Sequence, residues 1–280
     1  MLDFLWSDFN RIKIIYIFFV FVFFWLVMQR PSNNRDWEVG QERLPEIIFI
    51  GDAVKINNYR NFLWRKDGTV EKRYETKIFK IDEINSVDVL ISHFAKNEGL
   101  AHIFLSFGTV SGEHIVISVE SRREIGEKFS PLLGLLRQFE IIYIVGSERD
   151  LIGLRTDVRE GERVYLYPTV APPEKAQALF REFAREINSL HLKPKIYNTL
   201  FRNCTNEITR KVETVTDLNF PFSWKTVMPG YFDEVLYEMK LIPHNKPFSE
   251  IKKEHLIDNG KVDYLADDYS EQLRKIIKRE

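Results

Sequence analysis

The sequence contains a single cysteine among 280 residues, so no disulfide can form within the chain, and a zinc site built from several cysteines is excluded. It also lacks an excess of charge, because 40 Lys and Arg residues stand against 41 Asp and Glu residues. Proteins that bind nucleic-acid phosphates need a clear basic excess, so no nucleic-acid partner is expected. The sequence shows no nucleotide-binding loop, no haem motif and no metal-ligating cluster, and we predict no cofactor.

One long apolar run stands near the N-terminus, reading IIYIFFVFVFFWLVM over Ile14–Met28. Residues 12–28 would span roughly 25 Å as a helix, which is just enough for a bilayer core. A cleaved signal peptide would need small residues before the cut, and residues 28–31 (MQRP) offer none. A buried core helix is the other alternative, but this run is apolar on all sides. We therefore predict an uncleaved single-pass anchor at residues 1–30, with bilayer contact at residues 12–28 and an orientation that the flanking basic residues do not decide.

After a short linker, PSNN at residues 31–34, the rest of the chain (31–280) is predicted to form one domain. Its first part holds short segments rich in β-branched and aromatic residues, bounded by Gly, Asp and Asn, and this pattern predicts strands. TVSG at Thr109–Gly112 is typical of a hairpin turn. The predicted strands are Ile47–Ile50, Val54–Asn57, Val87–His93, Ala101–Phe107, Ile115–Val119, Ile141–Val145 and Val164–Tyr167.

After Pro172 the apolar period becomes that of a helix. Helices are predicted over Glu174–Leu190, from an N-cap at Asn203, over Tyr231–Leu241, and near the end of the charged tail. A strand-rich half followed by a helical half predicts the α+β class.

Cys204 is the first candidate for chemistry, because Asn203 before it has the character of an N-cap and makes the cysteine the first helical residue. The N–H groups and partial positive charge of a helix N-terminus favour a thiolate and can hold a developing oxyanion. Arg202 would add to the positive field. The alternative is an inert buried cysteine, which the polar neighbours on both sides disfavour.

A thiolate nucleophile needs a base, and the base needs a third group that orients it. His102 begins an otherwise apolar strand and leads into the predicted hairpin. If the turn is centred at Ser111, His102 lies opposite Glu120, whose carboxylate could orient the imidazole. A register slip of one residue would place Ser121 there instead. Taken alone, His102 could be structural, and Glu120 could pair with its arginine neighbours.

Further residues could bind or orient a substrate. Arg122 and Arg123 could sit at the mouth of the site and bind a headgroup or phosphate, or could belong to a structural ion-pair network. Tyr197 and Asn198 could orient the loop before Cys204 or supply an oxyanion donor, and Asn198 could instead only close the loop. A second charged cluster, formed by Arg149, Asp150 and Arg155, leaves the same two alternatives open.

Several sequence blocks, taken in order, resemble the Lnb-type domain, a family of bacterial membrane proteins that includes lipoprotein intramolecular transacylases. The resemblance covers roughly residues 33–275. The blocks are RDW (35–37), AHIFLSF (101–107), ISVESRREIGEKFS (117–130), GLLRQFEIIYIVGSERDLIGLRT (134–156), VYLYP (164–168) and YNTLFRNCTN (197–206).

The resemblance implies a permuted papain-like fold, NlpC-like and similar to lecithin:retinol acyltransferase, in which the histidine strand precedes the cysteine helix. It implies that Cys204 takes an acyl chain from a lipid ester as a thioester, while His102 shuttles the proton. The N-terminal amine of a diacylated lipoprotein would then attack. It also implies that residues 31–280 lie on the outer, periplasmic side of a bacterial cytoplasmic membrane, with membrane phospholipid or diacylated lipoprotein as substrate.

Two other functions remain open on the same residues. The Cys–His pair could deliver the acyl group to water, as a lipase, thioesterase or amidase of the cell envelope does. The domain could also be a non-catalytic envelope module in which Cys204 is simply buried.

Overall fold

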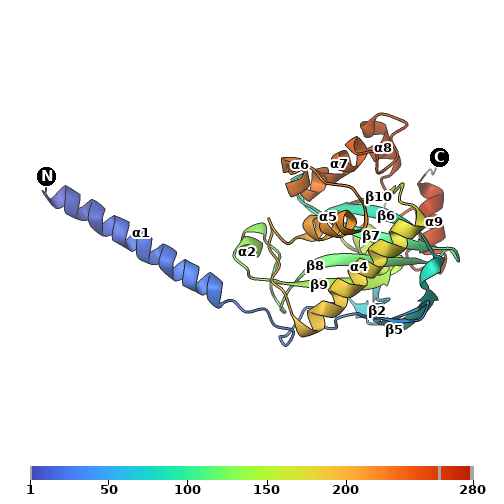
Figure 1. The fold of residues 1–280 in the computed structure, drawn as a ribbon, viewed down its shortest axis with the longest axis horizontal. Helices are drawn as coiled ribbons and strands as arrows, with labels where there is room; N and C mark the ends of the chain where they lie inside the picture. The colour runs from blue at the N-terminus through green and yellow to red at the C-terminus, as the bar shows by residue number, and fades with distance from the viewer. Residues whose placement is uncertain (1, 258–259, 278–280) are drawn as a thin grey trace.

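The computed structural model describes residues 2–257 and 260–277, with side chains from residue 11 onward except those of residues 12, 23, 25 and 27. A long N-terminal helix, α1 (Leu2–Met28), points away from a body of mixed sheet and helices (Figure 1). The body has the strand-rich half and the helical half that the sequence predicts, in the same order along the chain.

An eight-stranded sheet forms the centre of the body, in the order β1-β2-β9-β8-β7-β6-β10, with β5 paired to β2. Neighbouring strands are antiparallel except β2 and β9, which are parallel. β3 and β4 form a separate two-stranded ribbon. The strands are β1 (Glu46–Ile50), β2 (Ala53–Arg60), β3 (Leu63–Trp64), β4 (Val70–Glu71), β5 (Tyr74–Lys80), β6 (Ile84–His93), β7 (Ala101–Thr109), β8 (His114–Arg122), β9 (Glu140–Ser147) and β10 (Arg163–Pro168).

The helices follow the predicted pattern in the second half and add short elements that the sequence did not predict. The stripe of Ala176, Leu179, Phe180, Phe183 and Ile187 is buried, as the helical period requires. The helices are α2 (Pro131–Leu135), α3 (Glu148–Leu151), α4 (Pro173–Leu192), α5 (Cys204–Val215), α6 (Trp224–Val227), α7 (Phe232–Glu238), α8 (Phe248–Glu254) and α9 (Tyr269–Ile276), together with the 3₁₀ turns η1 (Ile81–Glu83) and η3 (Pro229–Tyr231) and the π-helical turn η2 (Leu154–Val158).

Both faces of the sheet are covered, which is why its central strands are apolar nearly throughout. On one face, Phe183 of α4 and Ile208 of α5 pack in a cluster with side chains such as Ile103 of β7. On the other face, Phe104 packs in a second cluster with Leu273 of α9. Alternate residues of β7 thus enter two different cores, and the site residues on this strand are held from both sides.

The predicted bilayer contact at residues 12–28 falls within α1. Most of the described side chains of this segment stand exposed, with Ile14, Ile17 and Phe21 at 66, 64 and 68%. The side chains of residues 12, 23, 25 and 27 lie outside the described ones. Over the part of the chain that the structure describes, no helix is both long and apolar enough to cross a membrane.

The segment after α1 packs against the domain more closely than the word linker implies. Ser32 donates its backbone N–H to Glu140 at 3.1 Å, and the Asn33 side-chain amide donates to the backbone oxygen of Leu190 at 2.7 Å. The Trp37 indole N–H donates back to Asn33 at 3.0 Å. These contacts fix the point at which α1 leaves the body.

Candidate active site

Cys204 is the first residue of α5, as the sequence predicts, and the adjacent Asn203 is the N-cap. The Asn203 side-chain oxygen accepts the backbone N–H of Asn206 at 2.9 Å, and its amide donates to the backbone oxygen of Thr199 at 2.6 Å. The cap therefore fixes both the start of the helix and the loop before it. The thiol of Cys204 is free and buried.

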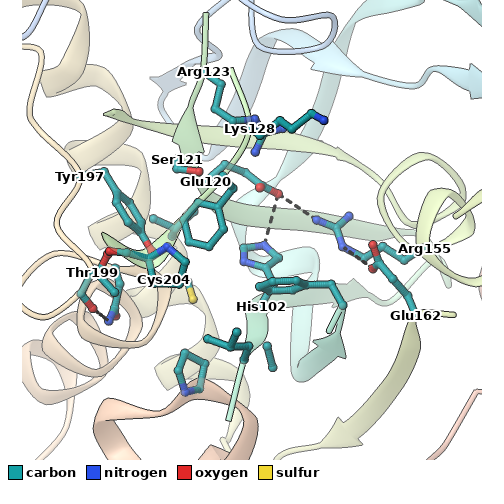
Figure 2. A pocket seen from close by; sticks show the side chains of 18 of the residues that line it. His102, Glu120, Ser121, Arg123, Lys128, Arg155, Glu162, Tyr197, Thr199 and Cys204 are labelled. Atoms are coloured by element: carbon teal, nitrogen blue, oxygen red, sulfur yellow. Dashed lines mark hydrogen bonds and ion pairs between the residues drawn. The ribbon is translucent and has the colours of Figure 1, made fainter. Parts of the chain in front are cut away.

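His102 and Glu120 come together through the hairpin of β7 and β8. The observed pairs, Phe104 with Ser118 among them, have the register that a turn centred at Ser111 predicts. His102 Nε2 lies 3.2 Å from Glu120 Oε1 and 2.7 Å from Ser118 Oγ. Figure 2 shows the contact between His102 and Glu120 as a dashed line, with Cys204 beside the imidazole.

Ser118 is a site residue that the sequence analysis missed. Its hydroxyl donates to Glu120 Oε1 at 2.8 Å, so its oxygen is left to accept from His102 Nε2. A carboxylate and a hydroxyl that both accept from Nε2 favour a proton on that nitrogen. Nδ1 then remains as the ring nitrogen for the thiol. The signal was present in the alternation, since residues 118 and 120 share a face of β8.

The Cys204 thiol lies next to His102 where the pairing of β7 with β8 has ended. Their pairing ends at Phe104 and Ser118, whereas β8 continues along β9 to Arg122. The backbone N–H of Ile103, next to the separation, helps to lower the pKa of the Cys204 thiol. Helix α5 thus sets its first residue against a backbone donor of β7 and the adjacent imidazole.

The charges of the three groups depend on one another. Burial of Cys204 opposes ionisation, but hydrogen bonding with His102 and the positive charge of that ring lower the pKa of the thiol below its usual value. Burial is the largest single effect on His102 and disfavours its imidazolium, but the charges and hydrogen bonds of Glu120 and Cys204 together outweigh it and raise the pKa of His102 to about 9. Despite burial, the pKa of Glu120 is held well below its usual range, chiefly by His102. The shifts of Cys204 and His102 both move the pair towards a thiolate beside an imidazolium.

Arg155 completes the chain of charges. Its guanidinium donates to Glu120 Oε1 at 2.9 Å and lies 4.9 Å above the ring of Phe104, and the imidazole of His102 also stacks on that ring at 5.4 Å. Arg155 stands on the π-helical turn η2, a rare geometry that is frequent at functional sites. It is buried, and Glu162 lies 3.9 Å from it (Figure 2). After His102, Arg155 also helps to keep Glu120 ionised, and it hydrogen-bonds the carboxylate.

Two backbone donors at the helix start remain for a ligand. The first N–H groups of an α-helix have no intrahelical acceptor, and Asn203 takes only that of Asn206. Among the described residues, the N–H groups of Cys204 and Thr205 make no hydrogen bond. Together with the helix dipole they form a site for negative charge next to the sulfur.

Tyr197 and Asn198 both shape the loop before Cys204, in different ways. Tyr197 is buried and lines the pocket, and burial followed by the Cys204 and Glu120 charges raises the pKa of its phenol. The Asn198 side-chain oxygen accepts the N–H groups of Leu200 and Phe201, each at 3.0 Å. Asn198 thus closes the loop, and its oxygen is engaged in doing so.

Arg122 and Arg123, for which the sequence left a substrate-binding and a structural role open, lie in different surroundings. Arg122 is buried with its guanidinium 4.1 Å above the ring of Trp37, and it donates to the backbone oxygens of Gln41 and Glu42 at 3.0 and 3.1 Å. It ties the N-terminal segment to β8 and does not line the pocket, because its donors are used by that segment. Arg123 does line the pocket, and it pairs with Glu38 at 2.7 Å.

The second charged cluster that the sequence indicated is divided. Asp150 is fully buried and takes Arg60 in a two-point contact at 2.8 and 2.9 Å, which is the structural alternative. Arg149 donates to Asn61 at 3.1 Å. Arg155 alone turns into the site.

The cysteine, histidine and glutamate open into a pocket of about 670 Å³. Its walls mix apolar side chains with charged ones, and this volume lies in the range of small-molecule sites. In Figure 2, Tyr197 and Thr199 flank Cys204, and Arg123 and Lys128 lie beyond Glu120. Within the described residues, no three His, Cys, Asp or Glu side chains are grouped to hold a metal ion.

Thiol labelling can test whether Glu120 controls the pKa values of His102 and Cys204. Glu120→Gln is expected to lower the pKa of His102 and raise that of Cys204, because the imidazolium loses its counter-charge. Alkylation of the single cysteine at pH 7 should slow about tenfold, since labelling follows the thiolate fraction. Glu38→Gln is the matched control, because Glu38 also lines the pocket but pairs with Arg123. Unchanged labelling in Glu120→Gln would show that the carboxylate does not govern the thiol.

A helix-capped cysteine, a strand histidine and a carboxylate in one pocket define a thiol-based site on a mixed α+β fold. Over residues 71–230 the chain matches the family model of the Lnb N-terminal periplasmic domain. This match covers more than half of the chain and includes all three residues, so the chain belongs to that family and is a protein of the bacterial cell envelope with an extracytoplasmic domain. No curated protein and no solved structure matches it.

Proposed function

We propose that this protein is a membrane-anchored thiol acyltransferase that moves an acyl chain from a lipid ester, through a thioester on Cys204, to an amine. The observation that carries the proposal is the contact of His102 with the thiol on one side and with Glu120, at 3.2 Å, on the other. This arrangement prepares a thiolate and supplies a proton donor next to it, and both are needed for acyl transfer.

In the first step, the Cys204 thiolate attacks the carbonyl carbon of the ester, and the carbonyl oxygen becomes an oxyanion. The N–H groups of Cys204 and Thr205 are placed to stabilise this charge. When the tetrahedral intermediate collapses, the carbon–oxygen bond to the alcohol breaks. The imidazolium of His102 gives its proton to the departing alkoxide, which leaves a thioester and a neutral imidazole.

In the second step, an amine attacks the thioester carbonyl, and the carbon–sulfur bond breaks as the amide forms. Neutral His102 takes the proton that the amine loses, and the sulfur departs as the thiolate. The thiolate–imidazolium pair is then restored. Glu120 stays ionised throughout and stabilises the imidazolium whenever it is present.

The surroundings of the site support a lipid as the acyl donor. The family is one of the cell envelope, where phospholipids and lipoproteins are at hand. The apolar sequence of residues 12–28, with its exposed side chains on α1, supports anchoring of residues 1–30 at the cytoplasmic membrane. We propose membrane phospholipid or a diacylated lipoprotein as substrate and the periplasmic side as the place of reaction.

Intact-mass spectrometry of the detergent-purified chain tests the thioester directly. After incubation with phospholipid and a diacylated lipopeptide, the wild type should gain the mass of one acyl chain, and hydroxylamine should remove it. Cys204→Ala should gain nothing, and no other cysteine can carry a thioester.

The lipopeptide masses then separate the fates of the chain. A gain on the peptide amine supports transfer, whereas free fatty acid without peptide gain would identify a hydrolase. No adduct and no change in either substrate would contradict the proposal and favour a non-catalytic envelope module.

A further inference from the structure

Large apolar side chains stand exposed at the mouth of the pocket. Phe94, Leu200 and Met228 line it and are 39, 42 and 46% exposed. They come from three separate stretches of the chain, so the mouth is apolar on several sides. A soluble body ordinarily scatters exposed residues of this kind singly.

The apolar surface continues outward from the mouth. Phe201, next to Leu200, is 75% exposed, and Leu132 on α2 is 64% exposed. The loop and α2 are joined, because the Thr199 hydroxyl donates to the backbone oxygen of Pro131 at 2.7 Å. Trp224 on α6 is 59% exposed. We call these residues the apolar rim: Phe94, Leu132, Leu200, Phe201, Trp224 and Met228.

The chain delivers α1 to the same side of the body. Arg137, two residues after α2, donates to the backbone oxygen of Gln29 at 3.5 Å, one residue after α1 ends. In Figure 1, α2 and α6 lie on the side toward which α1 leaves, and α9 lies on the opposite side. The exposed apolar helix α1 and the apolar rim therefore lie on the same side of the body.

Basic side chains accompany the rim. Arg123 and Lys128 line the pocket and lie together in Figure 2. Arg202, in the same loop as Phe201, is 38% exposed at its side chain. Apolar side chains that can enter the acyl region, next to guanidinium and ammonium groups at headgroup level, are typical of proteins that lie on an anionic bilayer.

We propose that the apolar rim docks on the surface of an anionic phospholipid bilayer, so that the pocket opens directly onto lipid. This inference rests on the proposed function and adds to it the route of the substrate: an acyl chain passes from the leaflet between Leu200 and Met228 to Cys204 without crossing water. The basic residues hold the headgroups at the edge of the rim.

The docking is tested on the full chain, reconstituted in vesicles of phosphatidylglycerol and phosphatidylethanolamine that carry a phospholipid with a photoreactive group in its acyl chain. After irradiation, labelled peptides should come from α1, from α2 and from residues 199–201. Cys204→Ala should show the same labelling, because docking needs no chemistry. Labelling confined to α1 would overturn the proposal, including the case in which a second copy or a protein partner covers the rim.

A paired variant provides the functional arm. Leu132→Glu with Phe201→Glu should lower the turnover of vesicle lipid about tenfold or more and leave a short water-soluble ester unaffected. The matched control is Ile78→Glu with Val110→Glu, because these side chains are also well exposed, at 64 and 66%, but belong to β5 and to the turn between β7 and β8. Wild-type turnover of vesicle lipid by the rim variant would overturn the inference. Cys204→Ala should lose turnover of both the vesicle lipid and the short ester but keep the labelling of the rim. This result tests the proposed function separately from the docking.

Discussion

Replacing Cys204 with alanine is expected to abolish acyl transfer, lowering kcat by about 10⁴-fold or more, and replacing His102 with alanine should have a comparable effect. In the proposed mechanism the thiolate forms the covalent bond, and the imidazolium both stabilises that thiolate and protonates the leaving alcohol. Because the two residues act as one unit, the double variant should be no slower than either single variant. Turnover of the lipid ester, followed by mass spectrometry, provides all three rates.

Ser121→Ala is the control for this experiment. Ser121 lines the same pocket and offers the hydroxyl that could serve as an alternative nucleophile. Its removal should leave turnover within about twofold of the wild type, since an unpaired hydroxyl without a base is a poor nucleophile. Retained turnover in Cys204→Ala, or multiplied losses in the double variant, would contradict a joint role for Cys204 and His102.

The positions of Cys204, His102 and Glu120 were predictable from the sequence because their determinants are local. A single turn sets the register of β7 and β8, so placing the turn at Ser111 also places His102 opposite Glu120. An N-cap is set by one side chain and the helix that follows, so Asn203 places Cys204 at the first helical position. Neither step needs knowledge of distant segments. The tertiary fold brings these two local features together. The family resemblance supplied the chain order, in which the histidine strand precedes the cysteine helix.

The residues whose surroundings the sequence left open are those whose partners lie far along the chain. The sequence left Arg122 open between the mouth of the site and a structural role, and in the structure Trp37 and the backbone of residues 41–42 cover it. Arg155, which donates to Glu120, stands on the π-helical turn η2. A single π-helical turn leaves no periodic pattern in the sequence from which it could be predicted. β5 was missed because most of its side chains face solvent, which leaves little alternation to read.

The largest effect on stability is expected from Asp150→Ala, which should lower the free energy of unfolding by about 3 to 5 kcal/mol. Asp150 is fully buried and accepts hydrogen bonds from the Arg60 guanidinium, the Phe62 backbone N–H and the Trp64 indole at 2.7 to 2.9 Å. Alanine would leave a buried guanidinium without its counter-charge and two further donors without an acceptor. Urea unfolding followed by circular dichroism measures the loss.

The cost is high because of where this pair lies. β2 joins the main sheet through the pairing of Arg60 with Gly146, and a side chain at Gly146 would meet the Arg60 backbone oxygen at 2.4 Å. Asp150, just beyond β9, clamps the Arg60 side chain across this narrow junction. Arg60 and Trp64 also line the pocket, so the same clamp supports one of its walls. Loss of Asp150 should therefore loosen both the sheet and the site.

Glu71→Ala is the matched comparison for this variant. Glu71 pairs with Arg73 at 2.7 Å, which is as close as the buried pair, but both side chains are well exposed at 44 and 39%. Solvent screens such a pair, so its loss should leave the unfolding midpoint close to that of the wild type. If Asp150→Ala unfolds no more easily than Glu71→Ala, the buried pair does not hold the junction. A large loss in Asp150→Ala alone would show that burial, rather than distance, determines what a carboxylate contributes in this fold.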